Sequence, residues 1–441
     1  MATVVGLATL GQGAAQESRY DEQAMAAILQ RLEAAEEEIQ RLKAAQVSPW
    51  EGPPGSHYVD YDKGLVLRPF DPVSDPFELT IRARMQFRYS AFQPDDAGTE
   101  DRSHFEVERG RLVFRGFMYD PALRFFINID ADTDDNHDMK FHDFWVNFKF
   151  HDAFDLHAGK GKVPGSYTWL ELSTTFRFAD RDVATTFFRA DRTIGLWATG
   201  DLGPARAFHY YALVGNGLVS TDLRAEDIDE LFVYSLLTWW DVLGDIGRGF
   251  SDLQWHDIPA VRIGQSFSFA RQNEGTGGTV LPEARFVRLG NGTRLTDPGA
   301  LAPGVTVNGF DYYLFSAFLV TKFRGWSANA EFYYRWINRF NTVGGPSPHD
   351  NLEAHGFVFE LGWMLVPKTF ELIGRISGIN TSFGDTWEYA AGANWFVNGT
   401  HSHKLTFDVS MLNDLPTSNS SPNFELGQEG LLYRVQYQVM F

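Results

Sequence analysis

Arginine recurs at alternate positions in two segments of the chain, residues 79–92 and 107–121. A guanidinium group stays charged at any physiological pH and binds phosphate or carboxylate through two parallel hydrogen bonds. The chemistry indicated is therefore recognition of oxyanions, without bond breaking. The six arginines are Arg82, Arg84, Arg88, Arg109, Arg111 and Arg115.

The composition limits the kinds of protein to which these arginines can belong. The 441 residues have a formal charge of −19, no cysteine, 44% hydrophobic residues and 15% aromatic residues, with 29 arginines against 9 lysines. The acidic balance disfavours nucleic acid as a partner. No stretch approaches the roughly 18 consecutive apolar residues of a membrane-spanning helix. The aromatic excess, with 38 Phe, 16 Tyr and 12 Trp, must be accommodated in another way.

From Leu79 onward, apolar and polar residues alternate with a period of two, which is typical of strands. In the first of these segments, apolar side chains from Leu79 to Tyr89 form one face and the arginines form the other. The pattern predicts sixteen strands. They span residues 79–92, 104–119, 123–134, 140–150, 154–163, 191–200, 205–215, 231–242, 259–272, 309–322, 326–339, 355–366, 369–379, 387–397, 402–413 and 429–441.

The connections between these segments alternate in length, with 243–258 as a long exception among the short ones. Short periplasmic turns and longer outer loops are typical of a membrane barrel. In hydrocarbon every backbone amide must be paired within the protein, so an all-strand chain spans a bilayer only as a closed barrel. The sequence thus predicts an all-β fold, a 16-stranded antiparallel transmembrane barrel over 79–441. The terminal Phe441 resembles the signal read by the barrel-assembly machinery.

The N-terminal part has a different organisation. Residues 1–15 form a short apolar run that ends in small residues, as in a secretory signal peptide. Residues 17–46 have apolar side chains at alternating spacings of three and four, which predicts an α-helical coiled-coil segment. A single helix lying on the body of the protein is the alternative. A Pro- and Gly-rich linker, 47–78, precedes the barrel.

Several motifs resemble the phosphate-selective porin O and P family of Gram-negative outer membranes. They are VERGRLVFRGFMYDP (107–121), LHAGKGKVPGS (156–166), FADRDVATTFFRADRTIGLWATGD (178–201) and YYALVGNG (210–217). Gly110 stands where the family has Ala, and Gly165 directly follows Pro164 where the family has Phe. The resemblance implies a sixteen-stranded barrel, a homotrimer, and a third loop folded into the pore. It does not establish phosphate selectivity.

If the apolar face meets lipid, the other face lines a water-filled lumen. Eight arginines then lie on four adjacent strands, because closure makes the last strand a neighbour of the first. Lumen charge of one sign concentrates counter-ions. Five acids, Glu106, Glu108, Asp130, Asp132 and Asp143, partly neutralise this wall. The eight arginines, expected to line the pore and bind anions, are Arg82, Arg84, Arg88, Arg109, Arg111, Arg115, Arg124 and Arg434.

The long connection 164–190 is expected to constrict the lumen. If its acids face the arginine wall, small solutes of either charge pass; if its arginines face the lumen, an oxyanion passes between successive guanidiniums. Alternatively, many of these arginines only pair with acids and stiffen the wall. Lys160 and Lys162 share the parity of the lipid-facing Leu156, unless a bulge at Gly159 or Gly161 shifts the register. The constriction residues are Arg177, Arg181, Arg189, Glu171, Asp180 and Asp182.

Other sites are less well supported. The histidines of 349–355 and 400–404 lie in predicted loops or turns, and the acidic run 130–138 lacks the spacing of an EF-hand. No nucleotide-binding fingerprint or nucleophile elbow is present. We therefore expect no metal, no cofactor and no enzymatic activity.

These observations predict an outer-membrane porin that passively admits phosphate or similar oxyanions, with its N-terminal helix in the periplasm. Its expected partners are two further copies in a homotrimer, membrane lipid with lipopolysaccharide, and the assembly machinery. Two alternatives stay open: a nonselective porin, and a protein that tethers the outer membrane to peptidoglycan through its N-terminal helix.

Overall fold

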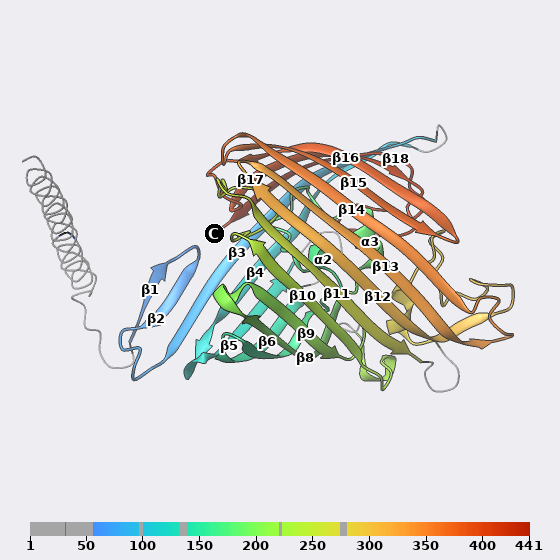
Figure 1. Cartoon of the computed structure of the whole chain (residues 1–441), viewed down its shortest axis with the longest axis horizontal. Coiled ribbons are helices and arrows are strands. Elements are labelled where there is room, and N and C mark those ends of the chain that lie inside the picture. Colours follow the sequence, from blue (N-terminus) through green and yellow to red (C-terminus); the bar gives the residue numbers. More distant parts are fainter. Residues whose placement is uncertain (1–30, 32–55, 97–99, 132–138, 220–222, 274–279) are drawn as a thin grey trace, which may run out of the picture. The chain divides into compact units, whose positions relative to one another are not determined.

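A computed structural model describes residue 31 and residues 56–96, 100–131, 139–219, 223–273 and 280–441 (Figure 1). The chain divides into two compact units, Met1–His57 and Tyr58–Phe441. The predicted signal peptide, 1–15, lies outside the described residues. So does the predicted coiled coil, 17–46, apart from Arg31, which is helical. Among the described residues, no helix is both long and apolar enough to cross a membrane.

The second unit is a closed antiparallel barrel of sixteen strands, as the alternating pattern predicted (Figure 1). Each strand pairs with the next along the chain, and β18 pairs with β3. The strands are β3 (Phe77–Pro94), β4 (Arg102–Met118), β5 (Asp120–Asp130), β6 (Lys140–His151), β7 (Phe154–Lys162), β8 (Arg192–Leu202), β9 (Phe208–Gly215), β10 (Val233–Leu243), β11 (Ala260–Gln272), β12 (Thr306–Phe323), β13 (Trp326–Val343), β14 (Asn351–Val366), β15 (Phe370–Thr381), β16 (Gly384–Phe396), β17 (His403–Asn413) and β18 (Gly430–Met440).

Closure rests on the last strand of the chain. The register of β18 against β3 runs from Gly430 opposite Pro94 to Met440 opposite Arg84. Phe441 then exchanges both backbone hydrogen bonds with Ala83, at 3.0 and 2.7 Å. The apolar positions of β18 face outward and its glutamines inward, because successive side chains of a strand point to opposite faces.

Two short strands extend the sheet beyond that seam. They are β1 (His57–Tyr61) and β2 (Leu65–Pro69), and they lie in the segment expected to be a linker. β2 pairs with β3 from Leu65 opposite Ile81 to Leu67 opposite Leu79. This is the same edge of β3 that pairs with β18 further along the strand, from Arg84 to Pro94. β2 thus covers the part of this edge of β3 that lies beyond Phe441, and no other strand can pair there.

The two ends of the barrel differ in their connections. At one end, called here the short-turn end, most links are brief, such as 152–153, 324–325 and 367–369. The other, the long-loop end, carries 163–191, 216–232, 273–305 and 414–429, although 382–383 is tight. One connection at the short-turn end, 244–259, is long, as its sequence suggested.

Few helices interrupt this architecture. Within the long connection 163–191 are α2 (Tyr167–Leu170) and α3 (Val183–Phe188), capped by the side chains of Ser166 and Asp182. The other helical turns in the described residues of the barrel unit are 3-10 segments: η1 (Pro204–Arg206), η2 (Ala225–Asp227) and η3 (Pro282–Phe286).

Candidate functional site

The inward face of β3 and β4 carries the two arginine series. On β3 the outward Met85 and Phe87 are exposed, whereas the alternating Gln86 and Arg88 are completely buried inside the barrel. On β4 the predicted inward acids and arginines differ in parity, so a regular strand could not point both inward. A bulge resolves this difference, since Gln86 lies opposite Arg109 and Phe87 opposite Val107. Two successive charged residues, Glu108 and Arg109, thus face the lumen.

Arg88 and Arg109 meet the acids of the lumen at mid-height. Arg88 lies 3.1 Å from a Glu108 oxygen and 3.1 Å from Asp180 of the long connection. Arg109 lies 2.6 Å from the same Asp180 oxygen and 3.1 Å from Glu108. Glu106 is 3.9 Å from Arg88. These two guanidiniums are neutralised, as expected if arginines serve to stiffen the wall.

Two more of the predicted arginines are paired with acids. Arg434 on β18 is fully buried and its Nε donates to Asp408 at 2.8 Å. Arg111 on β4 lies 2.5 Å from Asp130 on β5. Arg111 also stands directly opposite Arg84 in the sheet register, so two cations share one level of the wall.

The other four arginines have no carboxylate ion pair among the described residues. Arg84 faces inward beside Arg111 and Arg109. Arg82 donates to the backbone oxygen of Asp62 at 3.4 Å. Arg115 and Arg124 lie nearer the short-turn end and are exposed. The Nε of Arg124 donates to the oxygen of Pro121 at 3.0 Å.

The connection 163–191, called loop L3 here, folds into the barrel. Residues 173–188 are all buried, and α3 contacts β13, β14 and β15. In Figure 1, α2 and α3 are seen among the strands of the barrel. Wall side chains hold its backbone: Asp408 accepts from the amide of Ala179 at 2.8 Å and Glu388 from that of Val183 at 2.9 Å.

Among the predicted constriction residues, three help to fix L3. Arg177 donates to Ser327 and to the backbone oxygen of Phe250, both at 3.0 Å, and lies 3.2 Å from Glu360. Asp182 caps α3 and accepts from Ser377 at 2.8 Å. The carboxylate of Glu171 accepts from Thr175 at 2.8 Å. These contacts anchor the loop.

Two further predicted constriction residues, Arg181 and Arg189, lie around Trp169, whereas Asp180 pairs with Arg88 and Arg109. Arg181, Arg189 and Arg192 place their guanidinium carbons 4.6, 4.7 and 5.5 Å from the ring centroid of Trp169. The amine of Lys162 is 4.8 Å away. Attraction to the face of one indole ring offsets part of the repulsion among these four cations.

Lys162 therefore reaches the lumen side, although its parity with Leu156 predicted the lipid side. Its amine donates to the backbone oxygens of Trp169, Leu170 and Glu171, at 2.8, 3.2 and 3.3 Å. The register of β7 against β6 and β8 is continuous around Gly159 and Gly161, so no bulge produces this. Lys162 is the last residue of β7, where the chain turns into L3.

Together these groups form one basic cluster between β3, β4, β7, β8 and L3. Three carboxylates balance it in part: Asp130 on Arg111, Asp143 on Arg192 at 2.8 Å, and Asp191 at 3.4 Å from Arg192. Four of its cations lie close together, since all four contact the ring of Trp169. Cations thus outnumber carboxylates by two to one. The six cations of this basic constriction are Arg84, Arg111, Lys162, Arg181, Arg189 and Arg192.

The opposite half of the inner wall carries a packed apolar cluster between its buried ion pairs. Inward residues of β12 to β15, including Leu314, Tyr333 and Val358, pack with Val183 and Phe188 of L3. Phe178 of L3 packs against Ile373 and Ala390. This half of the barrel interior is filled by protein.

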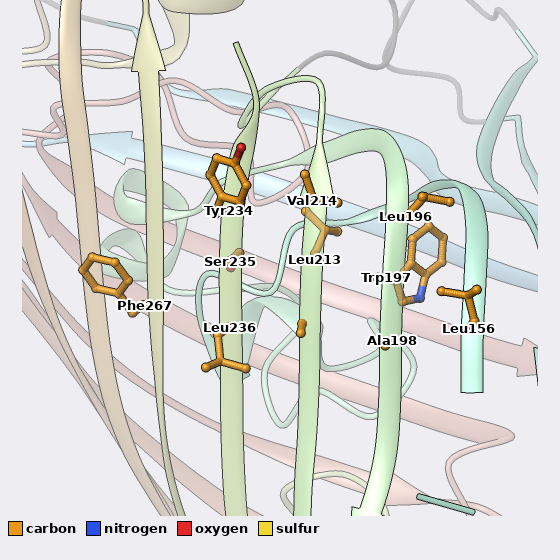
Figure 2. Close-up of a pocket in the computed structure, with 11 residues that line it drawn as sticks. Leu156, Leu196, Trp197, Ala198, Leu213, Val214, Tyr234, Ser235, Leu236 and Phe267 are labelled. Atoms are coloured by element: carbon orange, nitrogen blue, oxygen red, sulfur yellow. The ribbon is translucent and has the colours of Figure 1, made fainter. Parts of the chain in front are cut away.

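The outer face carries an open hollow of about 410 Å³ over β7 to β11 (Figure 2). Leu196, Tyr234, Leu236 and Phe267 line it, and each is about half exposed. Its small floor residues are Ala198 and Ala212. An apolar outward surface of this kind suits acyl chains and carries no charge for a solute. Within the described residues, no three His, Asp or Glu side chains are placed to hold a metal ion.

Sequence reasoning missed two of the six cations of the basic constriction, and the tryptophan that lies among them. The parity of Lys162 with Leu156 predicted the lipid side for its side chain. Arg192 lies just past residue 190, the predicted end of the loop. Trp169 is uncharged and was therefore not predicted, although a single tryptophan among the basic residues of a long loop can be recognised in the sequence. The histidines at 349, 355, 401 and 403 lie on or just before β14 and β17, which are not strands of this cluster.

Comparison with known proteins agrees with this architecture. Residues 79–209 match the sequence model of the phosphate-selective porin O and P family. No curated protein matches the chain. Among solved structures, it is similar to the anion-selective porin from Comamonas acidovorans, with 11% identity, 83% of this chain and 100% of that chain covered, and a TM-score of 0.55.

It is also similar to the trimer form of OmpT from Vibrio cholerae, with 9% identity, 83% and 99% coverage, and a TM-score of 0.51. At such identities these structures show the porin barrel fold. The family resemblance seen in the motifs is confirmed by the match over 79–209, where the chain is similar to the phosphate-selective porin O and P family.

Proposed function

We propose that the protein is an anion-preferring outer-membrane channel for phosphate or similar oxyanions. The observation that carries this proposal is the basic constriction, in which six cations face three carboxylates. A solute that passes must exchange part of its hydration for contacts with the lining. Guanidiniums and an ammonium supply the donors that an oxyanion accepts from.

The surroundings strengthen this preference. L3 and the side chains packed against it from the opposite half of the wall fill the lumen beside the constriction with protein, which focuses the field of the cations on the remaining path. The arginines paired to Asp180, Glu108 and Asp408 contribute little net charge. Selectivity then depends on the under-compensated cluster.

The family match and the porin fold support a location in the outer membrane, with the short-turn end in the periplasm. A homotrimer is part of the proposal, since the family resemblance implies one and the similar OmpT structure is a trimer form. Outer-membrane lipid would contact the apolar outer face, and Phe441 would be presented to the assembly machinery.

A nonselective porin is the second candidate. The ion pairs of Arg88 and Arg109 with Asp180 support it, because they place an acid of L3 against the arginine wall. The tethering role rests on the N-terminal helix, which lies outside the described residues, and no described contact favours it.

Planar-bilayer recordings separate these functions. Purified channels are placed in a tenfold KCl gradient, and the reversal potential gives the anion-to-cation permeability ratio; potassium phosphate then replaces chloride on one side. We expect a clear anion preference and a phosphate current. A reversal potential near zero would favour the nonselective porin, and a cation preference would overturn the proposal.

A further inference from the structure

Aromatic side chains face the lumen on each strand from β5 to β9. On β6 the outward Phe144 is half exposed, so the adjacent Trp145 faces the lumen, because successive side chains alternate between the two faces of a strand. Phe126 of β5 lies opposite Trp145, and Trp197 of β8 lies opposite His157 of β7. The five members of this group, called the ring band here, are Phe126, Trp145, His157, Trp197 and Tyr211.

The rings of the band contact one another without a break. Phe126 and Trp145 are stacked, with their ring centroids 5.1 Å apart. The ring centroid of His157 lies 5.0 Å from that of Trp145 and 5.2 Å from that of Trp197, and His157 is parallel to Trp197 within 11°. Tyr211 follows, with its centroid 6.3 Å from that of Trp197. The ring band is therefore one continuous aromatic surface across five strands.

The ring band adjoins the basic constriction on its short-turn side. β6 runs toward the short-turn end, and Trp145 follows Asp143 by two residues along this strand. The hydroxyl of Tyr211 donates to the backbone oxygen of Lys162, a cation of the constriction, at 2.9 Å. A solute whose charged group lies in the constriction can therefore place the rest of its body against the band.

Part of the ring band is open to the lumen. Phe126, Trp145 and Tyr211 are only partly buried, whereas Trp197 is almost completely buried among its neighbours. The helix α3 of L3 packs on β13, β14 and β15, across the barrel from these strands. The interior of a water-filled barrel is normally polar, and an exposed apolar patch commonly marks a ligand-binding site. The ring band is such a patch.

The charged groups that border the ring band do not exclude an anion from it. Arg115 of β4 lies opposite Phe126 in the register. The inward carboxylates of β6, β7 and β8 near the band each have a polar or charged partner. These pairs are Asp143 with Arg192 at 2.8 Å, Asp155 with Asn147 at 2.6 Å, and Asp201 with His209 at 2.6 Å.

We propose that the channel carries organic oxyanions whose apolar part is a flat ring, such as aryl phosphates and aromatic carboxylates. The cations of the basic constriction hold the oxyanion group, and the ring of the solute stacks on the ring band. Contacts between aromatic rings are favourable beyond the burial of their area, and they require a flat partner. This inference rests on the proposed function and narrows its substrate class.

Block of the chloride current tests this inference on the unaltered protein. Inorganic phosphate, cyclohexyl phosphate and phenyl phosphate are each added to wild-type channels in KCl, and the half-blocking concentration of each is measured. The two esters have the same charge and nearly the same size, but only the phenyl ring is flat. We expect phenyl phosphate to block at a concentration about fivefold lower than cyclohexyl phosphate, because of its stacking on the band. Equal concentrations for the two esters would overturn the inference.

Removal of one ring supplies the second arm. Trp145→Leu should raise the half-blocking concentration of phenyl phosphate about fivefold relative to that of inorganic phosphate, which has no ring to stack. Trp240→Leu is the matched control, because Trp240 faces outward and is 49% exposed, and it should leave both concentrations unchanged. The change in gel migration on heating verifies that each variant is folded. An unchanged ratio in folded Trp145→Leu would contradict the inference.

The outcomes separate this inference from the proposed function. If wild-type channels prefer anions in a KCl gradient but the two esters block equally, the proposed function stands and the ring band is refuted as a solute site. A wild-type channel without anion preference overturns the proposed function. In that case, block by phenyl phosphate that depends on Trp145 would still support stacking of an aromatic solute on the band.

Discussion

The two halves of the inner wall use the same side chain in opposite ways. On the side of β3 to β8, Arg84, Arg189 and Lys162 belong to a cluster that its carboxylates do not fully balance. On the side of β13 to β18, Arg375 lies 2.6 Å from Glu360 and 3.3 Å from Glu388. The first half presents net charge to a solute, and the second uses charge to hold L3 in place.

The difference shows that an inward arginine does not by itself form an anion site. A buried ion pair gains little net stability but is costly to break. Arginines such as Arg177 and Arg434 therefore fix geometry. Anion selectivity requires a group of cations that outnumbers the carboxylates around it, next to a part of the wall from which water is excluded.

Reversing charge in the basic constriction should have the largest effect. The double variant Arg84→Glu/Arg189→Glu changes the balance of the cluster by four charges. At the effective dielectric of a protein surface, one charge at 4 Å contributes about 4 kcal/mol, so we expect the anion-to-cation permeability ratio to fall at least about tenfold. Reversal potentials in a KCl gradient measure this. An unchanged ratio would show that the two halves do not differ in function.

Breaking an ion pair in the opposite half should instead reduce stability. Arg434→Gln leaves Asp408 buried without its charged partner, and Asp408 also holds the amide of Ala179. We expect a loss of about 3 kcal/mol in unfolding free energy, measured by guanidinium titration in detergent, with the ion preference retained. Arg339→Gln, at an exposed position, is the control. A large selectivity change with intact stability would contradict this assignment.

Removing the acid that joins the two halves should give a smaller change. Asp180→Asn keeps the shape of the side chain but releases Arg88 and Arg109 from one negative charge. The anion-to-cation ratio should rise about two- to threefold, since Glu108 still neutralises part of the pair. Bilayer recordings measure the ratio, and a decrease would show that these arginines lie off the path.

The loops that carry Asp229 and Glu283 should respond to pH without affecting selectivity. Burial raises the pKa of Glu283, in η3, from 4.5 to about 8, and its carboxylate accepts from the amide of Asp229. The packed loops bind a proton that released loops give up, so their packing free energy falls as pH rises from about 4.5 to about 8. Amide exchange around Asp229, corrected for its intrinsic pH dependence, should increase across this window. Glu283→Gln should abolish the trend.

The strands were predictable because lipid imposes a strict alternation on their outer face. The sixteen strands and the inward series on β3 followed from that rule alone. The bulge at Glu108 and Arg109 did not, since it leaves no apolar signature in the sequence. The β1–β2 hairpin escaped notice because His57–Tyr61 is exposed along its whole length and shows no buried face.

The site was less predictable because it depends on residues distant in sequence. Arginines were assigned to the lumen by parity, but only the fold shows which acid each one meets. Asp180 and Arg109, 71 positions apart, form a pair that no spacing rule indicates. The connection 244–259 was conspicuous by its length, whereas its position beside L3 depends on Phe250 and Lys322.

The attachments of L3 also set an order of events during biogenesis. Ala179 is held by Asp408, 229 positions later, and its oxygen accepts from Gln436, 257 positions later. Many anchors of this loop therefore belong to chain that is synthesised after it, whereas Arg88, Arg109 and Lys162 are synthesised before it. The hydrogen-bonding groups of L3 therefore lack these later partners until the final strands are in place. Contacts between residues so far apart in sequence are slow to form. Maturation of the passage should therefore lag behind formation of the first hairpins and coincide with sealing of the wall.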